Sequence, residues 1–111
     1  MSKPILVVTT TGSEQQALSI AEELVQNHLT ASVNLVPGVR TIYRFNGKVF
    51  DDDETLLIIK TTDEKFNEVS ASIERLHTYE TPEILAIESS TWTEGFHHWL
   101  SSSIEVPTNE N

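Results

Sequence analysis

The sequence has 111 residues, with 17 acidic against 7 basic side chains and a formal net charge of -10. This length is typical of one domain that folds without cross-links, and the lack of cysteine excludes disulfides, thiolate zinc sites, iron–sulfur clusters and a cysteine nucleophile. The acidic charge, with Lys and Arg scattered along the chain, does not favour binding to nucleic acid or to a membrane surface. The apolar run at 5–8 is too short for a signal peptide or a membrane span, which predicts a cytoplasmic protein. We expect one domain over residues 1–104 and a polar, frayed tail over 105–111.

The N-terminal part predicts a strand followed by an amphipathic helix. Residues 5–8 are all apolar and are closed by Gly12, as in a short buried strand. Ser13 and Gln16 have the spacing of a capping box at a helix start. Apolar residues then recur at helical spacing to about residue 28.

A long β-hairpin is predicted in the middle of the chain. Apolar and polar residues alternate from residue 30 to the Pro-Gly pair at 37–38, where we expect a bend or a bulge. Asn46 and Gly47 both tolerate a positive φ angle, which a two-residue type I′ turn requires. The return strand crosses the acidic stretch 51–54 and continues through residues 56–61.

The C-terminal part adds a helix, a strand and a last helix. The second helix is expected to start near residue 62 or 63, with Glu64 in its first turn, where negative charge suits the helix dipole. Residues 84–87 are apolar and predict a strand, and Thr93 can cap a short final helix. The order β-α-β-β-α-β with an additional C-terminal helix predicts an α+β fold, a ferredoxin-like two-layer sandwich.

Two of the predicted strands are apolar on both faces. A two-layer fold covers one face of its sheet with helices, and the other face is normally polar at alternate positions. Residues 56–59 and 84–87 are apolar throughout, and such a patch is rarely exposed on a soluble monomer. The pattern predicts self-association through the open face. The alternative is that the C-terminal helix, with Phe96 and Trp99, covers it.

Five blocks of the sequence match the motifs of one protein family. Residues 31–38 (ASVNLVPG) follow the pattern A-C-V-N-(I/L)-(I/V)-P-G, and residues 41–48 (TIYRFNGK) follow S-x-Y-x-W-x-G-K. Residues 58–62 (IIKTT) follow I-x-K-T, residues 77–84 (HTYETPEI) follow H-P-Y-x-x-P-E-I, and residues 99–100 (WL) end the pattern Y-x-x-W-(L/I). In their order the blocks span nearly the whole chain, which resembles the CutA family of divalent-cation tolerance proteins.

The resemblance implies a ferredoxin-like homotrimer, similar in architecture to the PII signalling proteins, with a role in tolerance to divalent metals and copper binding in some members. It implies no enzymatic reaction and no required cofactor. The family commonly has cysteine at the position of Ser32, and some copper-binding relatives have it at that of Thr9. Because soft thiolates select Cu(I), a Cu(I) site of that kind cannot form here. Thr78 and Phe45 also replace the family's proline and tryptophan. The expected metal chemistry is weak binding of Cu(II) or another divalent cation through imidazole and carboxylate.

His77 and Glu83 are the candidate metal ligands. Neutral imidazole suits Cu(II), and His77 falls on the family's histidine. The alternative is a surface histidine at a helix C-terminus, where its cationic form favours the helix dipole. His97 and His98 are adjacent on a predicted helix and point in different directions, so we expect a structural role for them. His28 is interpreted as a charge at the end of the first helix.

Five residues of the family motifs are predicted to line a polar pocket between subunits: Tyr43, Lys60, Tyr79, Glu83 and Trp99. In this interpretation Lys60 and Glu83 form a charge pair and the aromatic residues form the walls. A structural ion pair with interface packing is the alternative. The acidic stretch 51–54 lacks the spacing of a calcium loop, and we expect a solvated segment that discourages edge pairing.

Three functions are compatible with these features. The first is a trimeric metal-response protein that binds a divalent ion weakly. The second is a PII-like signalling module that binds a small anionic ligand between subunits, and the third is a structural trimer that acts through protein partners. The sequence contains no Gly-rich phosphate loop, nucleophile elbow or metalloprotease helix, so we expect no enzyme.

Overall fold

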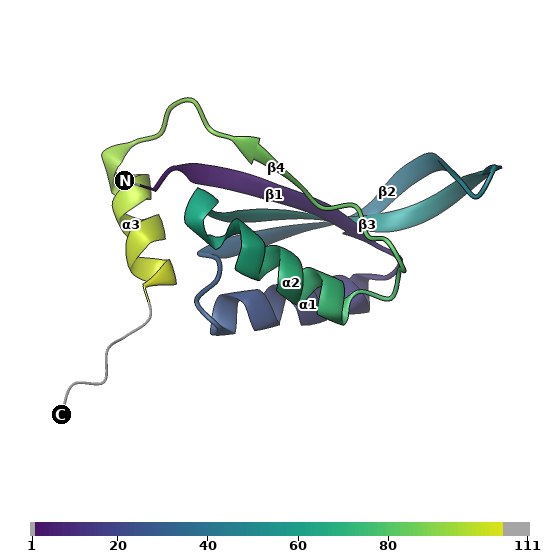
Figure 1. The fold of residues 1–111 in the computed structure, drawn as a ribbon, viewed down its shortest axis with the longest axis horizontal. Helices are drawn as coiled ribbons and strands as arrows, with labels where there is room; N and C mark the ends of the chain where they lie inside the picture. Colours follow the sequence, from purple (N-terminus) through teal and green to yellow (C-terminus); the bar gives the residue numbers. More distant parts are fainter. Residues whose placement is uncertain (1, 106–111) are drawn as a thin grey trace.

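The computed structural model describes residues 2–105. Its elements are, in order, β1 (Pro4–Thr11), α1 (Glu14–Gln26), β2 (Ser32–Phe45), β3 (Lys48–Thr62), a 3-10 turn (Asp63–Lys65), α2 (Phe66–Leu76), β4 (Leu85–Glu88) and α3 (Glu94–Ile104). The strands pair in the order β2-β3-β1-β4, antiparallel throughout, with α1 and α2 packed against one face of the sheet (Figure 1). The predicted α+β, ferredoxin-like sandwich is confirmed. Most of the predicted tail, residues 106–111, lies outside the described residues.

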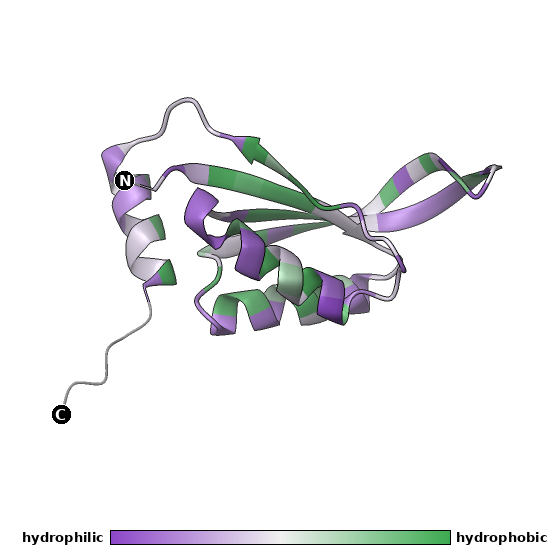
Figure 2. Cartoon of the chain, in the orientation of Figure 1, coloured by the Kyte–Doolittle hydropathy of each residue, from purple (hydrophilic) through white to green (hydrophobic). Residues whose placement is uncertain are grey.

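The hydrophobic core lies between the sheet and the two helices α1 and α2. Alternate residues of β1 and β3 point into it, because successive side chains of a strand face opposite sides. Its fully buried members are Val7, Ala17, Ile20, Leu24, Leu57, Ile59, Val69 and Ile73. Hydrophobic residues run along β1 and β4, while the β3 strand of the hairpin contains a continuous hydrophilic stretch at residues 51–54 (Figure 2). No helix among residues 2–105 has the length and apolar character needed to cross a membrane.

The hairpin forms as its turn chemistry predicts. Asn46 and Gly47 have φ angles of 51° and 76°, the left-handed values that a type I′ turn needs. The register between β2 and β3 shifts between Val36 and Val39, and Gly38 there has a φ of 72°. The predicted bulge is therefore confirmed. Beyond it, the hairpin projects away from the helical layer (Figure 1).

The predicted capping box at the start of α1 is only half formed. Ser13 Oγ accepts a hydrogen bond from the Gln16 backbone N–H at 3.1 Å, which satisfies one free donor of the helix end. The Gln16 side chain does not return to Ser13. Its Nε2 donates to the Leu76 carbonyl at 3.3 Å and its Oε1 accepts from the Thr78 hydroxyl, so Gln16 ties α1 to the C-terminal end of α2.

Several element boundaries differ from those predicted. Strand β1 continues through three threonines to Thr11, because backbone pairing with β3 extends past the apolar run. Helix α1 ends at Gln26, since His28 adopts a left-handed φ of 58°. The 3-10 turn at Asp63–Lys65 delays the start of α2 to Phe66.

Candidate functional site

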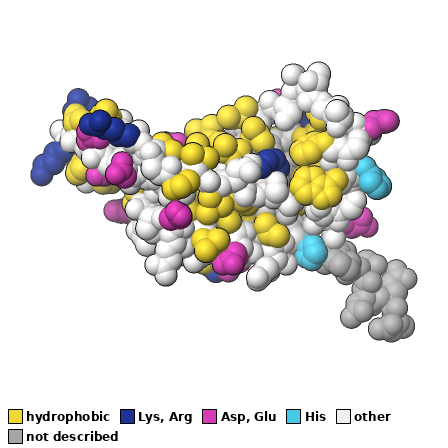
Figure 3. All heavy atoms as spheres, turned by 180° about the vertical axis from the view of Figure 1, so that it is seen from behind, with side chains coloured by type: hydrophobic (Ala, Val, Ile, Leu, Met, Phe, Trp, Pro, Cys, Tyr) yellow, Lys and Arg dark blue, Asp and Glu magenta, His cyan; other side chains and the backbone are white. Residues whose placement is uncertain are grey.

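The sheet face opposite the helices stays open in the single chain. Leu6 and Val8 of β1 pair with Ile87 and Leu85 of β4, and all four side chains point away from the helical core. Leu85 and Ile87 are 45% and 48% exposed. Seen from behind, the molecule shows hydrophobic side chains gathered over the middle of the body (Figure 3). We call these four residues with Ile58 the open-face patch.

Helix α3 does not cover the open-face patch. It packs beside β3 through its buried residues Leu100 and Ile104, at the end of the molecule remote from the hairpin (Figure 1). Trp99 on the same helix is 46% exposed. The sequence-based alternative, in which α3 folds over the sheet with Phe96 and Trp99, is therefore wrong.

A cavity of about 520 Å³ lies at the base of the hairpin. Its aromatic walls come from both hairpin strands and from the segment between α2 and β4: Tyr43, Phe45, Phe50 and Tyr79. The rings of Tyr43 and Phe50 stack with centroids 5.3 Å apart, as expected for residues directly opposite each other in the ladder. We call this space the hairpin cavity.

The charged lining of the hairpin cavity is mainly acidic. Three carboxylates, Glu54, Glu80 and Glu83, and one guanidinium, Arg44, line it. Glu54 is only 5% exposed, because the segment 77–84 lies over it, and its Oε2 accepts a hydrogen bond from the Tyr79 hydroxyl at 2.6 Å. Acidic side chains therefore dominate the charge at the cavity wall.

Asp51, Asp52 and Asp53 of the acidic stretch are exposed, as the sequence suggested, whereas Glu54 is buried. Asp51 accepts two hydrogen bonds from the Arg40 guanidinium, at 2.9 and 2.6 Å, and this pairing lowers the pKa of Asp51. Asp52 accepts a hydrogen bond from the Tyr43 hydroxyl at 2.6 Å. With Glu54 buried, the stretch forms a cross-strand polar network, which the strand register creates by placing 51 and 52 opposite 42 and 41.

Both tyrosines of the chain donate to carboxylates, and both have raised pKa values. The hydrogen bond to Asp52 is the main cause for Tyr43, with smaller contributions from burial and nearby negative charge, and its pKa rises to about 12. For Tyr79 burial is the largest cause, followed by the hydrogen bond to Glu54. Each effect favours the neutral phenol, because the phenolate would be desolvated or would face a carboxylate.

An alkaline titration followed by tyrosinate absorbance should show late ionisation of both residues. The chain has only two tyrosines, so a Tyr43→Phe variant reports Tyr79 alone and a Tyr79→Phe variant reports Tyr43 alone. We expect Tyr43 to ionise near pH 12 and Tyr79 also above the usual value of about 10. Because the folded pKa values are raised, the stability from these hydrogen bonds is present below about pH 10 and is lost as the pH rises through the folded pKa values. A folded protein whose tyrosines ionise near pH 10 would contradict this.

His77 is a buried part of the scaffold in the single chain. It is 9% exposed, and its Nε2 lies 2.7 Å from the Thr10 carbonyl, to which it donates. Its Nδ1 accepts from the Tyr79 backbone N–H at 3.0 Å, and the two rings lie 4.6 Å apart. Because both ring nitrogens have partners, neither is free for a metal in this arrangement. The alternative of a surface histidine is wrong in its exposure, although His77 does cap the C-terminal end of α2, and the assignment of His77 as a metal ligand stays a prediction.

The structure brings together only some of the predicted pocket residues. Tyr43, Tyr79 and Glu83 meet at the hairpin cavity. Lys60 lies elsewhere on β3, where its ammonium contacts Asn34 Oδ1 and burial lowers its pKa. The predicted charge pair of Lys60 with Glu83 is absent among the ion pairs of the described residues, and Trp99 lies on α3, away from the cavity.

Of the other histidines, His97 has the structural role predicted for it, His98 is exposed, and His28, interpreted as a terminal charge, contacts α3. His28 Nδ1 lies 3.2 Å from the Ser103 carbonyl and so links the end of α1 to α3. His97 Nε2 lies 3.2 Å from the Ser2 carbonyl, and its ring stacks on Trp92. Among residues 2–105 no group of three or more His, Asp or Glu side chains is placed to hold a metal ion.

The sequence reasoning missed Glu54, Arg44 and Phe50 as lining residues. Glu54 was grouped with its exposed acidic neighbours, although successive residues of a strand face opposite sides of the sheet, so that Glu54 and Asp53 point in opposite directions. Phe50 lies directly opposite Tyr43 once the Asn46 turn sets the register. That pairing was available from the sequence, whereas burial of Glu54 by the segment 77–84 was not.

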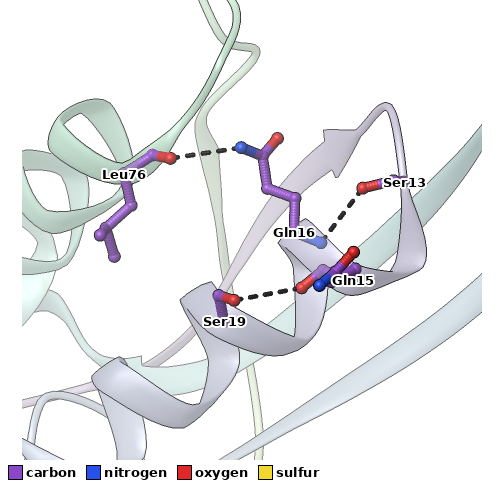
Figure 4. A pocket seen from close by; sticks show the side chains of 5 residues that line it. All are labelled: Ser13, Gln15, Gln16, Ser19 and Leu76. Carbon is purple, nitrogen blue, oxygen red and sulfur yellow. Dashed lines mark hydrogen bonds between the residues drawn. The ribbon is translucent and has the colours of Figure 1, made fainter.

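A second, shallower hollow lies at the start of α1. It has a volume of about 290 Å³ and is lined by Ser13, Gln15, Gln16, Ser19 and Leu76. Its polar groups already bond to one another across the α1–α2 junction (Figure 4). The N–H groups at the start of α1 are already partly capped by Ser13. The lining contains no charged side chain, so this hollow is interpreted as a junction between α1 and α2.

Comparison with known proteins gives one consistent result. A family model described as CutA1 divalent ion tolerance protein matches residues 5–103. The divalent-cation tolerance protein CutA of Thermus thermophilus is 40% identical over 95 residues, covering 86% of this chain and 92% of that protein. The chloroplastic CutA protein of Arabidopsis thaliana is 33% identical over 99 residues, covering 89% of this chain and 54% of the longer plant protein. A solved structure of the periplasmic divalent cation tolerance protein CutA from Archaeoglobus fulgidus superposes with a TM-score of 0.89 at 31% identity, covering 92% of this chain and 99% of that one.

Proposed function

We propose a function for this chain from its membership of the CutA1 divalent ion tolerance family. It works as a homotrimer in divalent-cation tolerance and has no catalytic activity. The observation that carries the proposal is the open-face patch. Leu85 and Ile87 are about half exposed on it, and α3 leaves it uncovered. Burying such a patch against further copies of the chain removes apolar surface from water.

The number of subunits is proposed from the family resemblance, and the chemistry of the open face supports self-association. The face is apolar near β4 and contains one basic residue, Lys60, whose ammonium contacts Asn34. A polar pair within an apolar surface favours one orientation of the partner, because any other arrangement leaves the charge desolvated and unpaired. This pattern suits a defined assembly of identical subunits.

Metal binding is proposed to be weak. Cu(II) or another divalent ion could use His77 with Glu83 only after His77 releases one of its two hydrogen bonds, and this rearrangement lowers the affinity. The chain has no thiolate to offer, and no resident cofactor is required. A small anionic ligand is not favoured, since three carboxylates line the hairpin cavity.

The cellular location is proposed to be the cytoplasm. The cysteine-free composition is compatible with that reducing compartment. The names of two relatives point to a chloroplast and a periplasm, so membership of the family does not determine the compartment.

Growth under metal stress tests the proposed role. Bacteria that lack their own CutA protein should tolerate more added copper when they express this chain than when they carry an empty vector. A Lys60→Ala variant, expressed to the same level, tests whether copper tolerance depends on the contact between Lys60 and Asn34 in the open face. Equal growth with the chain and with the empty vector, over copper, zinc and cobalt, would contradict a tolerance function.

A further inference from the structure

Glu54 places a buried negative charge at the wall of the hairpin cavity. It is 5% exposed and receives a hydrogen bond from Tyr79 at Oε2. Among the described residues, the three ion pairs are those of Arg40, Lys65 and Arg75, and none of them includes Glu54. Buried carboxylates are normally paired with a positive charge, because removing the charge from water is costly. Within residues 2–105 this carboxylate therefore has no ion-pair partner, although Arg44 lines the same cavity.

The walls beside Glu54 suit the apolar part of an organic cation. Tyr43 and Phe50 stack on one another across the hairpin, and Tyr79 closes the other side. Aromatic faces attract ammonium groups through the negative potential of their π systems. The volume of about 520 Å³ lies within the range of sites that enclose a small organic molecule.

We propose that the hairpin cavity binds a small organic cation, an ammonium group on an aromatic or apolar skeleton, with the ammonium at Glu54 and the skeleton between the aromatic rings. A bare metal ion suits the site less well, because no three carboxylate or imidazole groups of residues 2–105 converge on one point. An anion would face the carboxylates of Glu54, Glu80 and Glu83, with only the guanidinium of Arg44 to offset them in the lining. The inference is independent of the tolerance role, since a cation can bind whether or not growth depends on it.

Three probes with one skeleton test the charge preference on the unmodified protein. Phenethylammonium, 2-phenylethanol and phenylacetate differ mainly in being positive, neutral and negative, and each is titrated into the full chain by calorimetry at neutral pH. We expect the cation to bind at least about tenfold more tightly than the alcohol, as for a charged hydrogen bond. Phenylacetate should show the weakest binding.

Variants locate the binding site. Glu54→Gln should weaken phenethylammonium binding by about tenfold or more while changing that of the alcohol little. Glu22→Gln on the exposed side of α1 makes the same change in net charge and should leave both affinities unchanged. Phe50→Leu, at a partly exposed position, is expected to weaken cation binding severalfold. This second variant tests the proposal even if Glu54→Gln does not fold.

Three results would overturn the proposal. One is no binding of any probe at millimolar concentration. Another is equal or tighter binding of phenylacetate, which would support an anion site. The third is cation binding that is unchanged in folded Glu54→Gln or in Phe50→Leu, which would place the ammonium elsewhere on the acidic surface.

Discussion

An Ile87→Glu variant is expected to run as a monomer of 12.5 kDa in light scattering, while the unmodified protein shows close to three times that mass. Ile87 is 48% exposed in the single chain, so a carboxylate there remains solvated when the chain is alone. At a subunit interface the same charge would be buried without a partner, at a cost of about 3 kcal/mol or more for each contact. A trimer contains several such contacts, so association should weaken by well over a hundredfold.

Leu18→Glu is the matched control for this change. Leu18 is 50% exposed and lies on α1, in the layer opposite the open-face patch. The Leu18→Glu variant introduces the same charge at a similarly exposed apolar position, and we expect it to leave the mass of the assembly unchanged. Circular dichroism should show a folded chain for both variants. An Ile87→Glu protein that keeps the full mass would show that the open face is not the interface.

A His77→Ala variant is expected to lose about 2–4 kcal/mol of unfolding free energy, because two hydrogen bonds and a buried ring disappear together. The ring joins Thr10 at the end of β1 to Tyr79 in the segment after α2. That segment covers Glu54, so the loss should also loosen the hairpin cavity. Urea unfolding followed by fluorescence of the two tryptophans measures the change.

A His77→Gln variant separates the structural role from metal binding. The glutamine amide can still donate to the Thr10 carbonyl, so it should recover about 1 kcal/mol relative to alanine. It is a much poorer ligand for Cu(II) than imidazole. Calorimetric titration with Cu(II) should therefore show weaker binding in both variants if His77 is a ligand. Unchanged copper binding would remove His77 from the predicted metal site, and unchanged stability in His77→Ala would contradict the structural role.

Local chemistry explains which parts of the fold could be predicted. The turn at Asn46 and Gly47 requires positive φ angles that few residues accept, and the cap at Thr93 accepts from the Phe96 N–H. Both depend on residues within three positions of each other. The apolar pattern of β4 likewise predicted an open face that needs a partner, because strand alternation follows from backbone geometry alone.

The pocket predicted between subunits stays a prediction, and within the single chain only some of its residues are neighbours, because they come from distant segments. Tyr43 and Tyr79 meet at one cavity only because the segment after α2 folds back over the base of the hairpin. Lys60 belongs to the same motif set, yet its position on β3 directs it to Asn34 and not to Glu83. That two residues belong to motifs of the same family does not determine whether their side chains are neighbours in the folded chain.

The sequence by itself determined the order of the elements, the hairpin turn, the apolar open face and the family, since each depends on short-range pattern or on the order of motifs. Only the tertiary structure decided that His77 is buried with both nitrogens bonded, that Glu54 is enclosed with no ion-pair partner among residues 2–105, and that α3 leaves the open face of the sheet uncovered. These features depend on contacts between residues far apart in the chain, such as the 25 positions between Glu54 and Tyr79. The energy of burying a charge or an imidazole is set by that packing, which no local pattern encodes.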